Sequence, residues 1–321
     1  MALLGSSSST GDERAYAVYD VFTSRPTHGN PVAIVLDAHG LSPTQRQSIA
    51  AWTNLSETTF LEPATHLEAD YKLDIYTPAV RLPFAGHPTL GSANAWLDAG
   101  GEPKQAGFVT QECGIGLVKI KISNSTNEEG GRRRLAFAAP PFLKEGDVAP
   151  ALLEQICTAL GLNSTQHVLA AQHIANGPPW IGLLLRDADV VKDVIPPPSD
   201  LAWAALGEHM VGVVGAYPDP DLEGKDISRP AFEVRAFCGG KEHFEDPVTG
   251  SLNAGIAKWL ISTAHPSASG SGYIALQGRH RGRDGQVFVE VDAEARVSKG
   301  ARGTIWVGGD AVPVVKGTIL L

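Results

Sequence analysis

One short pattern of residues occurs twice in this chain, about half a chain apart, and it limits the possible folds more than any other feature. Each copy is a turn that contains proline and runs into a segment of small residues. The copies read His87-Pro88 with Gly91, Ser92, Asn94 and Ala95, and Asp246-Pro247 with Gly250, Ser251, Asn253 and Ala254. Such a repeat indicates an internal duplication. We therefore expect two similar lobes whose turns face each other across a cleft.

His87 and Asp246 open the two copies, so the duplication predicts that they occupy equivalent corners of one site. Both are residue types that transfer protons in enzymes. A structural interpretation is also available, with His87 as a polar turn residue and Asp246 as a helix N-cap. Capping does not require a histidine in one copy and an aspartate in the other, and this difference favours catalysis.

Gly91-Ser92 and Gly250-Ser251 are expected at the starts of two helices. A helix start presents unpaired backbone N–H groups and the positive end of the helix dipole, and glycine lets a ligand approach closely. Ordinary turn chemistry explains any single Gly-Ser pair. Two pairs facing one cleft predict instead a site that holds a small carboxylate-bearing substrate from both sides.

The chain has 321 residues, which is enough for two domains with separate cores. Its net charge of −9 at pH 7 argues against nucleic acid or an anionic membrane surface as the main partner. No apolar stretch of the sequence approaches the roughly 20 residues that a membrane-spanning helix needs. The expected partner is a small molecule, with no nucleic acid and no membrane.

Three cysteines are scattered along the chain without the spacing of a disulfide framework or a zinc site. They are Cys113, Cys157 and Cys238. A reducing cytoplasm is therefore the expected compartment. His243, Glu245 and Asp246 form the one local group to consider as metal ligands, but charged residues ahead of a helix are more often solvated. We expect no metal site.

Short runs of aromatic and β-branched residues separated by turns fill most of the chain. Helices are expected at 43–53, 88–99, 149–162 and 247–261. This arrangement departs from the strand–helix alternation of a doubly wound nucleotide-binding sheet, and the sequence has no phosphate-binding glycine motif. We predict an α+β fold.

The polar stretch 123–134 is the expected boundary between the lobes. The expected parts are a flexible N-terminal tail at 1–14, an N-terminal lobe at 15–128, to which the last C-terminal strand can return, and a C-terminal lobe at 129–321. Glycine turns are expected in the strand-rich tail at Gly278, Gly285 and Gly308-Gly309. Gln155-Ile156 lies about where Gln47-Ser48-Ile49 lies in the first half, a weak second sign of duplication.

Glu57 is a third candidate for proton transfer. It stands between the helix at 43–53 and a strand expected at 58–61. A carboxyl group at the start of a strand beneath an apolar sheet is partly desolvated, and desolvation raises its pKa towards the range useful for acid–base catalysis. The competing interpretation is a glutamate in a surface loop.

Four separate motifs, in order, resemble the phenazine-biosynthesis PhzF-like isomerase family. They are Asp20-Val21-Phe22-Thr23 with Gly29-Asn30-Pro31-Val32-Ala33, then 54–60, then Leu82-Pro83-Phe84-Ala85-Gly86-His87-Pro88-Thr89, and finally Glu245-Asp246-Pro247-Val248-Thr249-Gly250-Ser251. The resemblance implies the two-lobed fold of diaminopimelate epimerase, in which each lobe is a curved, mostly antiparallel sheet or barrel around a central helix. It also implies a homodimer.

The same resemblance implies roles for particular residues. Glu57 matches the catalytic glutamate of the family, which moves a proton between carbons of a small unsaturated acid without a cofactor, and Asp246 and His87 match its partners. Further positions match family residues that contact the substrate: Ser56, Gly86, Gly250 and Ser251. Two departures affect the pocket. The residues before Asn54 are Ala51-Trp52-Thr53, where the family commonly has a charged residue, then glutamate, then methionine. In addition, Cys238-Gly239-Gly240 stands where a loop of the family near the cleft is expected.

The leading hypothesis is therefore a cofactor-independent isomerase in which Glu57 moves a proton within a small carboxylate-bearing metabolite, in a biosynthetic pathway of secondary metabolism. A two-base racemase or epimerase on the same fold, with Asp246 and either His87 or Glu57 on opposite faces, is the second hypothesis. A non-catalytic protein that binds a small metabolite is the third. Proton exchange with solvent distinguishes one base from two.

Overall fold

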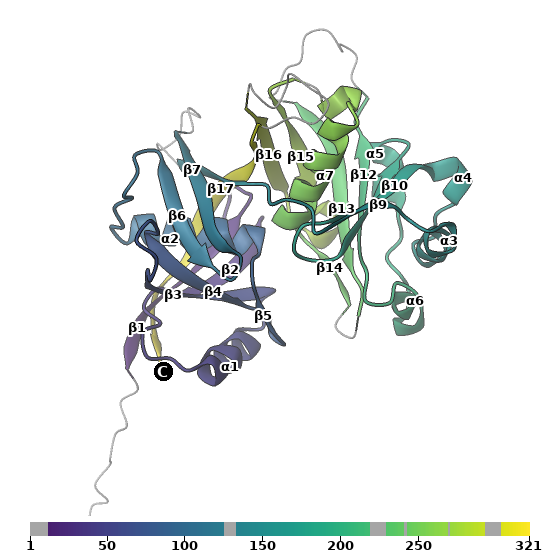
Figure 1. Cartoon of the computed structure of the whole chain (residues 1–321). Helices are drawn as coiled ribbons and strands as arrows, with labels where there is room; N and C mark the ends of the chain where they lie inside the picture. Colours follow the sequence, from purple (N-terminus) through teal and green to yellow (C-terminus); the bar gives the residue numbers. More distant parts are fainter. Residues whose placement is uncertain (1–11, 125–132, 219–228, 241–242, 269, 293–302) are drawn as a thin grey trace, which may run out of the picture.

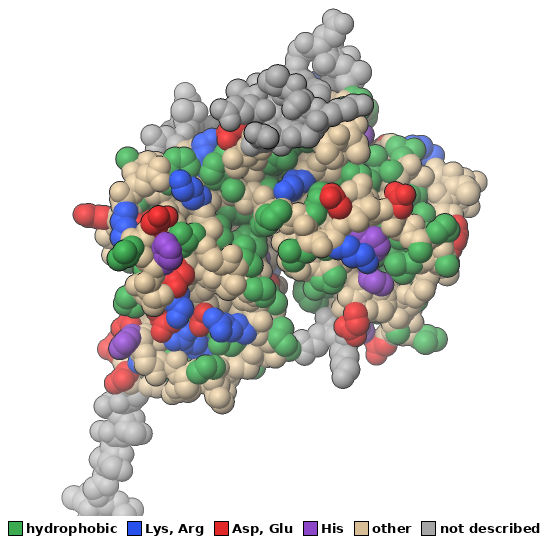
Figure 2. All heavy atoms as spheres, in the orientation of Figure 1, with side chains coloured by type: hydrophobic (Ala, Val, Ile, Leu, Met, Phe, Trp, Pro, Cys, Tyr) green, Lys and Arg blue, Asp and Glu red, His purple; other side chains and the backbone are tan. Residues whose placement is uncertain are grey.

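The computed structural model describes residues 12–124, 133–218, 229–240, 243–268, 270–292 and 303–321. Two lobes lie side by side, and each encloses one helix within strands (Figure 1). The space-filling view shows two rounded halves that meet along a furrow (Figure 2). Most of the predicted tail, residues 1–11, lies outside the described residues, whereas Glu13 and Arg14 already belong to the first strand.

The first lobe is a closed barrel of eight strands. These strands are β1 (Glu13–Val21), β2 (Asn30–Val35), β3 (Glu57–Pro63), β4 (Tyr71–Tyr76), β6 (Phe108–Cys113), β7 (Gly116–Asn124), β8 (Arg133–Ala138) and β17 (Ile305–Leu320). Each pairs with the next in that order, and β17 pairs back with β1. A short strand, β5 (Arg81–Leu82), adds to β4.

Helix α2 (Gly86–Asp98) fills the centre of this barrel. Its first ten residues are all buried, and it packs against strands around the wall. Small side chains make this possible, because a Cβ atom added at Gly91 would lie 2.4 Å from Val32 Cγ1. A helix buried on every side has no polar face. Its small residues, rather than a periodic apolar stripe, therefore identify it.

The second lobe wraps a similar set of strands around helix α7 (Gly250–Ser262). Its strands are β9 (Lys144–Asp147), β10 (Val168–Ala175), β11 (Trp180–Leu185), β12 (Met210–Ala216), β13 (Pro230–Cys238), β14 (Phe244–Asp246), β15 (Gly272–Gln277) and β16 (Gly285–Val291). Its shorter helices are α3 (Pro150–Ala159), α4 (Ser164–His167), α5 (Ala188–Asp193), α6 (Asp200–Ala204), η1 (Pro266–Ala268) and η2 (Arg279–Arg281). Of these, α3, α5 and α6 cover the outer face of β11 and β12. None of the helices in the described residues is long and apolar enough to cross a membrane.

The two lobes share one connection plan. In the first lobe the chain forms α1 (Pro43–Thr53) between the two parallel strands β2 and β3. In the second lobe it forms α5 and α6 between the two parallel strands β11 and β12. The parallel pair β4–β6 encloses β5 and α2, and the pair β13–β15 encloses β14 and α7. Among the described residues the remaining named strand pairs are antiparallel. The predicted α+β fold with two pseudo-symmetric lobes is confirmed.

The two copies of the sequence repeat differ in where their helices begin. Helix α2 begins at Gly86, so Gly91-Ser92 lies inside the helix, whereas α7 begins at Gly250. In the second copy the residues through Asp246 extend as β14 and pair with β13, which delays the helix. The prediction that Gly91-Ser92 opens a helix is therefore wrong.

Two further predictions about elements are wrong. Gly308-Gly309 lies within β17, not in a turn. A Cβ atom at Gly308 would lie 2.3 Å from the carbonyl oxygen of Leu135, so glycine here permits close packing of strands. Helix α3 is not the counterpart of α1, because it precedes β10, and the place between β11 and β12 belongs to α5 and α6.

Strand pairing also corrects the division of the chain. The predicted C-terminal lobe starts at 129, but β8 pairs with β7 and β17 and so completes the first barrel. Residues 125–132 of the expected boundary loop lie outside the described residues. The last strand, β17, pairs with β16 and β8 near its start and with β1 over most of its length, so the chain returns to the first lobe.

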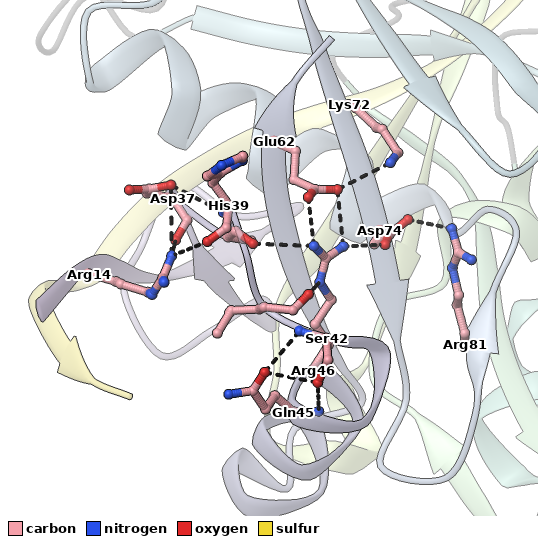
Figure 3. Close-up of polar contacts among 12 residues, drawn as sticks. Arg14, Asp37, His39, Ser42, Gln45, Arg46, Glu62, Lys72, Asp74 and Arg81 are labelled. Atoms are coloured by element: carbon pink, nitrogen blue, oxygen red, sulfur yellow. Dashed lines mark hydrogen bonds and ion pairs between the residues drawn. The ribbon is translucent and has the colours of Figure 1, made fainter. Parts of the chain in front are cut away.

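A buried arginine attaches α1 to the barrel wall (Figure 3). Arg46 forms ion pairs with Glu62 on β3 at 2.7 Å and with Asp74 on β4 at 2.5 Å, and its side chain is 7% exposed. It also donates to the backbone carbonyls of Ala38 and Leu41. Sequence analysis did not single out Arg46. Its effect is to fix the helix that leads into Glu57.

Candidate active site

Glu57 is the first residue of β3, just beyond the end of α1. Asn54 closes α1 with φ 53°, a left-handed conformation that ends the helix and redirects the chain. The Glu57 side chain is 15% exposed, and its Oε2 atom lies 3.3 Å from Nε2 of His87. Burial, with a smaller contribution from Asp246, raises the pKa of Glu57 to about 8. Glu57 is therefore mostly protonated at neutral pH.

His87 is the second residue of α2 and is buried. Burial lowers its pKa to about 3, although a hydrogen bond to the backbone of Pro31 acts in the opposite direction. Its Nε2 atom has no hydrogen-bond partner among the described residues, so the bond to Pro31 uses Nδ1–H. The ring is therefore neutral, and its unprotonated Nε2 faces Glu57.

Asp246 ends β14, and each of its carboxylate oxygens accepts a hydrogen bond. Asn30 donates to Oδ1 at 3.0 Å, and the Thr249 hydroxyl donates to Oδ2 at 2.5 Å. Gln277 Nε2 donates to the Thr249 oxygen at 2.9 Å, which leaves the hydroxyl hydrogen for Asp246. Burial raises the pKa of Asp246 to about 6, and the two donors limit that rise. Asp246 is therefore mostly ionised at neutral pH.

The capping interpretation of Asp246 is wrong. Thr249, not Asp246, occupies the N-cap position of α7, and its side chain makes no capping hydrogen bond. The Asp246 carboxylate instead accepts from side chains on both lobes, Asn30 on the first and Thr249 on the second.

Asn30, at the start of β2, joins the two lobes at this place, and sequence analysis did not assign it a role. Its amide donates to Asp246 at 3.0 Å and to the backbone carbonyl of Val248 at 2.8 Å. The same nitrogen lies 3.4 Å from His87 Nδ1, but its two hydrogens are used by the shorter contacts. A polar residue between glycine and proline in the first motif was the available signal.

Gly86 and Gly250 bring the starts of the two central helices together. A Cβ atom at Gly86 would lie 3.0 Å from Gly250 Cα, and one at Gly250 would lie 3.2 Å from the backbone nitrogen of His87. Ser251 follows Gly250 and is buried, and Ser56 precedes Glu57 and is half-buried. Five of the seven predicted site residues therefore gather where the lobes meet, and Ser56 and Ser251 directly adjoin two of them in the chain. We call this group the interlobe site: Ser56, Glu57, Gly86, His87, Asp246, Gly250 and Ser251.

Gly91 and Ser92 are not part of the interlobe site. The Ser92 hydroxyl is buried and lies 2.8 Å from the Thr59 hydroxyl, and Gly91 packs against Val32. The prediction that two Gly-Ser pairs hold a carboxylate is therefore wrong. Helix α2 presents Gly86-His87 to the site instead.

The suggested metal ligands do not converge. His243 Nε2 faces Asp200 at 3.3 Å, and Glu245 forms an ion pair with Arg235 at 2.8 Å. Adjacent residues of a strand point to opposite faces, so Asp246 turns away from Glu245. Within the part of the chain that the structure describes, no three His, Cys, Asp or Glu side chains are grouped to hold a metal ion.

Two pseudo-symmetric lobes carry carboxyl and imidazole groups at their junction, and the named relatives and the family place the chain among isomerase enzymes. The chain belongs to the phenazine biosynthesis-like protein family, PhzC-PhzF, whose model matches residues 19–317.

Several relatives match nearly the whole chain, and two of them are named isomerases. Antisense-enhancing sequence 1 of Schizosaccharomyces pombe is 32% identical over 95% of this chain and 98% of its own length. Two proteins named trans-2,3-dihydro-3-hydroxyanthranilate isomerase, from Pseudomonas chlororaphis and Pseudomonas fluorescens, are 50% and 29% identical, each over 95% of this chain and 99% of its own length.

Solved structures share the fold. A Bacillus anthracis phenazine biosynthesis protein of the PhzF family superimposes with a TM-score of 0.76 at 23% identity, covering 97% of this chain and all of that one. A probable proline racemase from Agrobacterium radiobacter superimposes with a TM-score of 0.58 at 14% identity, covering 96% and 93%. The two-lobed architecture therefore extends to racemases.

Proposed function

We propose that this enzyme is a cofactor-independent isomerase in which Glu57 moves a proton between two carbons of a small carboxylate-bearing substrate. Trans-2,3-dihydro-3-hydroxyanthranilate, named for the Pseudomonas relatives, is the compound we would assay first. The single observation that supports this proposal most strongly is the environment of Glu57. It is a buried carboxyl group with a pKa raised to about 8, and it lies 3.3 Å from a neutral histidine nitrogen.

A carboxyl group in this state is suited to both directions of proton transfer, because its pKa is near the operating pH. The ionised form takes a proton from an acidic carbon, and the protonated form returns one. His87 Nε2 lies 3.3 Å from Oε2 of Glu57 and offers an acceptor towards which the protonated carboxyl group can turn.

The other residues of the interlobe site hold the substrate in this proposal. The backbone N–H groups at Gly250 and Ser251 begin a helix of 13 residues and favour a carboxylate. Asp246 remains ionised and accepts a hydrogen bond from a polar substituent of the substrate. Its charge also opposes ionisation of Glu57, which keeps the pKa of Glu57 high.

The substitution Glu57→Gln tests the proposal. It preserves size and removes the titrating group, so turnover should fall by about 100- to 10,000-fold, the usual contribution of a general acid–base group. Affinity for a product-like ligand should remain nearly unchanged. Glu68→Gln, an exposed glutamate, serves as the matched control and should retain full activity. Full turnover by Glu57→Gln would eliminate the assignment.

A two-base racemase is the alternative that the fold allows, since proline racemase shares this architecture. It needs a second proton-transferring group that faces the opposite side of the substrate. Asp246 is the candidate by position, but its two hydrogen-bond donors hold it in the ionised state. This difference favours the single-base proposal.

A further inference from the structure

A second polar cluster lies at the first turn of α7, on the C-terminal side of the interlobe site. The Ser251 hydroxyl oxygen accepts a hydrogen bond from Trp180 Nε1 at 3.0 Å. The Ser251 backbone carbonyl accepts one from Asn176 Nδ2 at 2.9 Å. Exposure is 2% for Trp180, 4% for Asn176 and 6% for Ser251. Sequence analysis assigned no role to Trp180 or Asn176.

The bond from Trp180 determines how Ser251 can act. An indole nitrogen only donates hydrogen bonds, so Ser251 must accept in this pair and its own hydroxyl hydrogen must point elsewhere. A serine inside a helix often donates to the carbonyl four residues earlier. Ser251 makes no such bond within the described residues. Its hydrogen is therefore available for a ligand.

Asn176 gives an independent sign that a ligand belongs here. Its amide nitrogen is fixed against the first turn of α7, and its Oδ1 atom is buried without a hydrogen-bond partner among the described residues. A buried acceptor left unpaired costs about 1–3 kcal/mol. A ligand hydrogen-bond donor beside the α7 start would remove that cost. The neighbouring Gly250 touches Gly86 and the backbone of His87, so Ser251 directly follows the contact between the two helix starts.

We propose that Trp180 is a positioning residue that orients the Ser251 hydroxyl as a dedicated hydrogen-bond donor to the carboxylate of the ligand. This proposal rests on the proposed function in one respect, the carboxylate at the start of α7. By occupying the acceptor side of the hydroxyl, Trp180 removes the orientations in which the Ser251 hydrogen would point towards β11. Asn176 donates a hydrogen bond to the backbone carbonyl of Ser251. The position of the Ser251 hydroxyl group is therefore fixed as well as its direction.

The test compares binding of anthranilate and anthranilamide by calorimetry in the wild-type protein, Trp180→Phe, Ser251→Ala and the double variant. The two probes differ only in the carboxylate. Wild type should prefer anthranilate. Trp180→Phe should weaken anthranilate about tenfold and anthranilamide less than twofold. In the Ser251→Ala background, Trp180→Phe should change anthranilate affinity less than twofold, because the oriented hydroxyl is already absent.

Trp306→Phe is the matched control, since its Nε1 also donates a hydrogen bond, to Asp292 at 3.2 Å, away from the interlobe site. It should leave both affinities unchanged. If Trp180→Phe does not fold, 3-benzothienylalanine at position 180 keeps the ring size and removes only the donor, and the same result is expected.

Equal weakening of both probes, or a Trp180→Phe effect that persists without the Ser251 hydroxyl, would overturn the proposal. A wild-type protein with no preference for anthranilate would also overturn it. These measurements require no turnover, so they are separate from the Glu57→Gln result. If Trp180→Phe keeps the wild-type preference for anthranilate while turnover still depends on Glu57, the role of Trp180 alone is refuted.

Discussion

At the scale of single residues, the interlobe site places two buried carboxyl groups in different ionisation states. Asp246 accepts one hydrogen bond on each oxygen, whereas Glu57 lies against the unprotonated nitrogen of a neutral His87. Hydrogen bonds to a carboxylate stabilise its charge, and burial without them favours the neutral acid. Pairs of groups with diverging pKa values commonly divide catalytic roles. In the function proposed above, Glu57 is the group that exchanges a proton.

The pH dependence of kcat/KM should report Glu57. If the ionised carboxylate begins the reaction, kcat/KM should rise with pH and level off with an apparent pKa near 8, because the pKa of Glu57 is raised to about 8. His87 should contribute no step between pH 5 and 8, since its pKa is lowered to about 3. Initial rates between pH 5 and 9.5 test this, and a profile that falls across pH 7–8 would contradict it.

The same carboxyl group should reduce stability at neutral pH. Between its ordinary pKa of 4.5 and the raised value of about 8, the folded protein binds a proton that the unfolded chain has lost, so stability decreases as pH rises. Glu57→Gln removes this decrease. The variant should therefore gain stability relative to wild type as pH rises. The difference between their free energies of unfolding should be larger at pH 8 than at pH 5 by about 1–4 kcal/mol. Urea unfolding at both pH values measures the difference, and a gain that is equal at both would disagree.

Residue type and the repeat predicted His87 and Asp246 as site residues, and the family resemblance favoured Glu57 over a surface-loop glutamate. Asn30 and Trp180 escaped notice for a physical reason. Their roles depend on hydrogen bonds to residues more than 70 positions away, at Asp246 and Ser251. A single sequence can mark such a residue as unusual, as the motif around Asn30 does, but it does not show which partner lies so far away in the chain.

At the scale of secondary structure elements, α1 is held by the Arg46 ion pairs before it leads into Glu57. Arg46→Met should cost up to about 3–5 kcal/mol, because it removes the buried partner of Glu62 and Asp74 and leaves them only the more exposed Lys72 and Arg81. Arg81→Met is the control. Arg81 pairs with the same Asp74 but its side chain is 54% exposed, so its loss should cost less than about 1 kcal/mol.

Thermal and urea unfolding of the two variants provide the comparison. Arg46→Met should be clearly less stable than Arg81→Met, and the stability of Arg81→Met should be close to that of wild type (Figure 3). Equal stabilities would show that the contact between α1 and the barrel depends on apolar packing instead.

Sequence spacing predicted most elements, including α1 over 43–53, but the repeat did not give the same start for the two central helices. The repeat aligns Gly91 with Gly250, but the structure begins its helices at Gly86 and Gly250. Proline at Pro88 is compatible with the first turn of a helix, so α2 can begin before it. In the second copy strand pairing of β14 with β13 keeps the corresponding residues extended. Tertiary contacts therefore decide a boundary that local sequence leaves open.

At the scale of the whole molecule, the duplication is structural but the chemistry that we propose uses one side only. Strand β3 begins with Glu57, whereas its counterpart β12 begins with Met210, which cannot transfer a proton. A site with one exchangeable carboxyl group should return the substrate's own hydrogen in at least part of the turnovers.

Turnover in D₂O, with the product analysed by mass spectrometry, tests this one-sided arrangement. We expect a measurable fraction of product without solvent deuterium at the new C–H bond. One solvent deuterium in every product molecule from the first turnover would instead indicate two bases, with Asp246 as the second.

The path of β17 has a consequence for synthesis on the ribosome. Because this strand closes the first barrel between β8 and β1, residues 13–138 cannot complete their hydrogen-bonded wall when they emerge. They must wait until residues 305–320 have been translated. Nascent chains of this protein should therefore expose the unpaired sides of β1 and β8 for most of translation, which makes them natural clients for chaperones that shield strand edges.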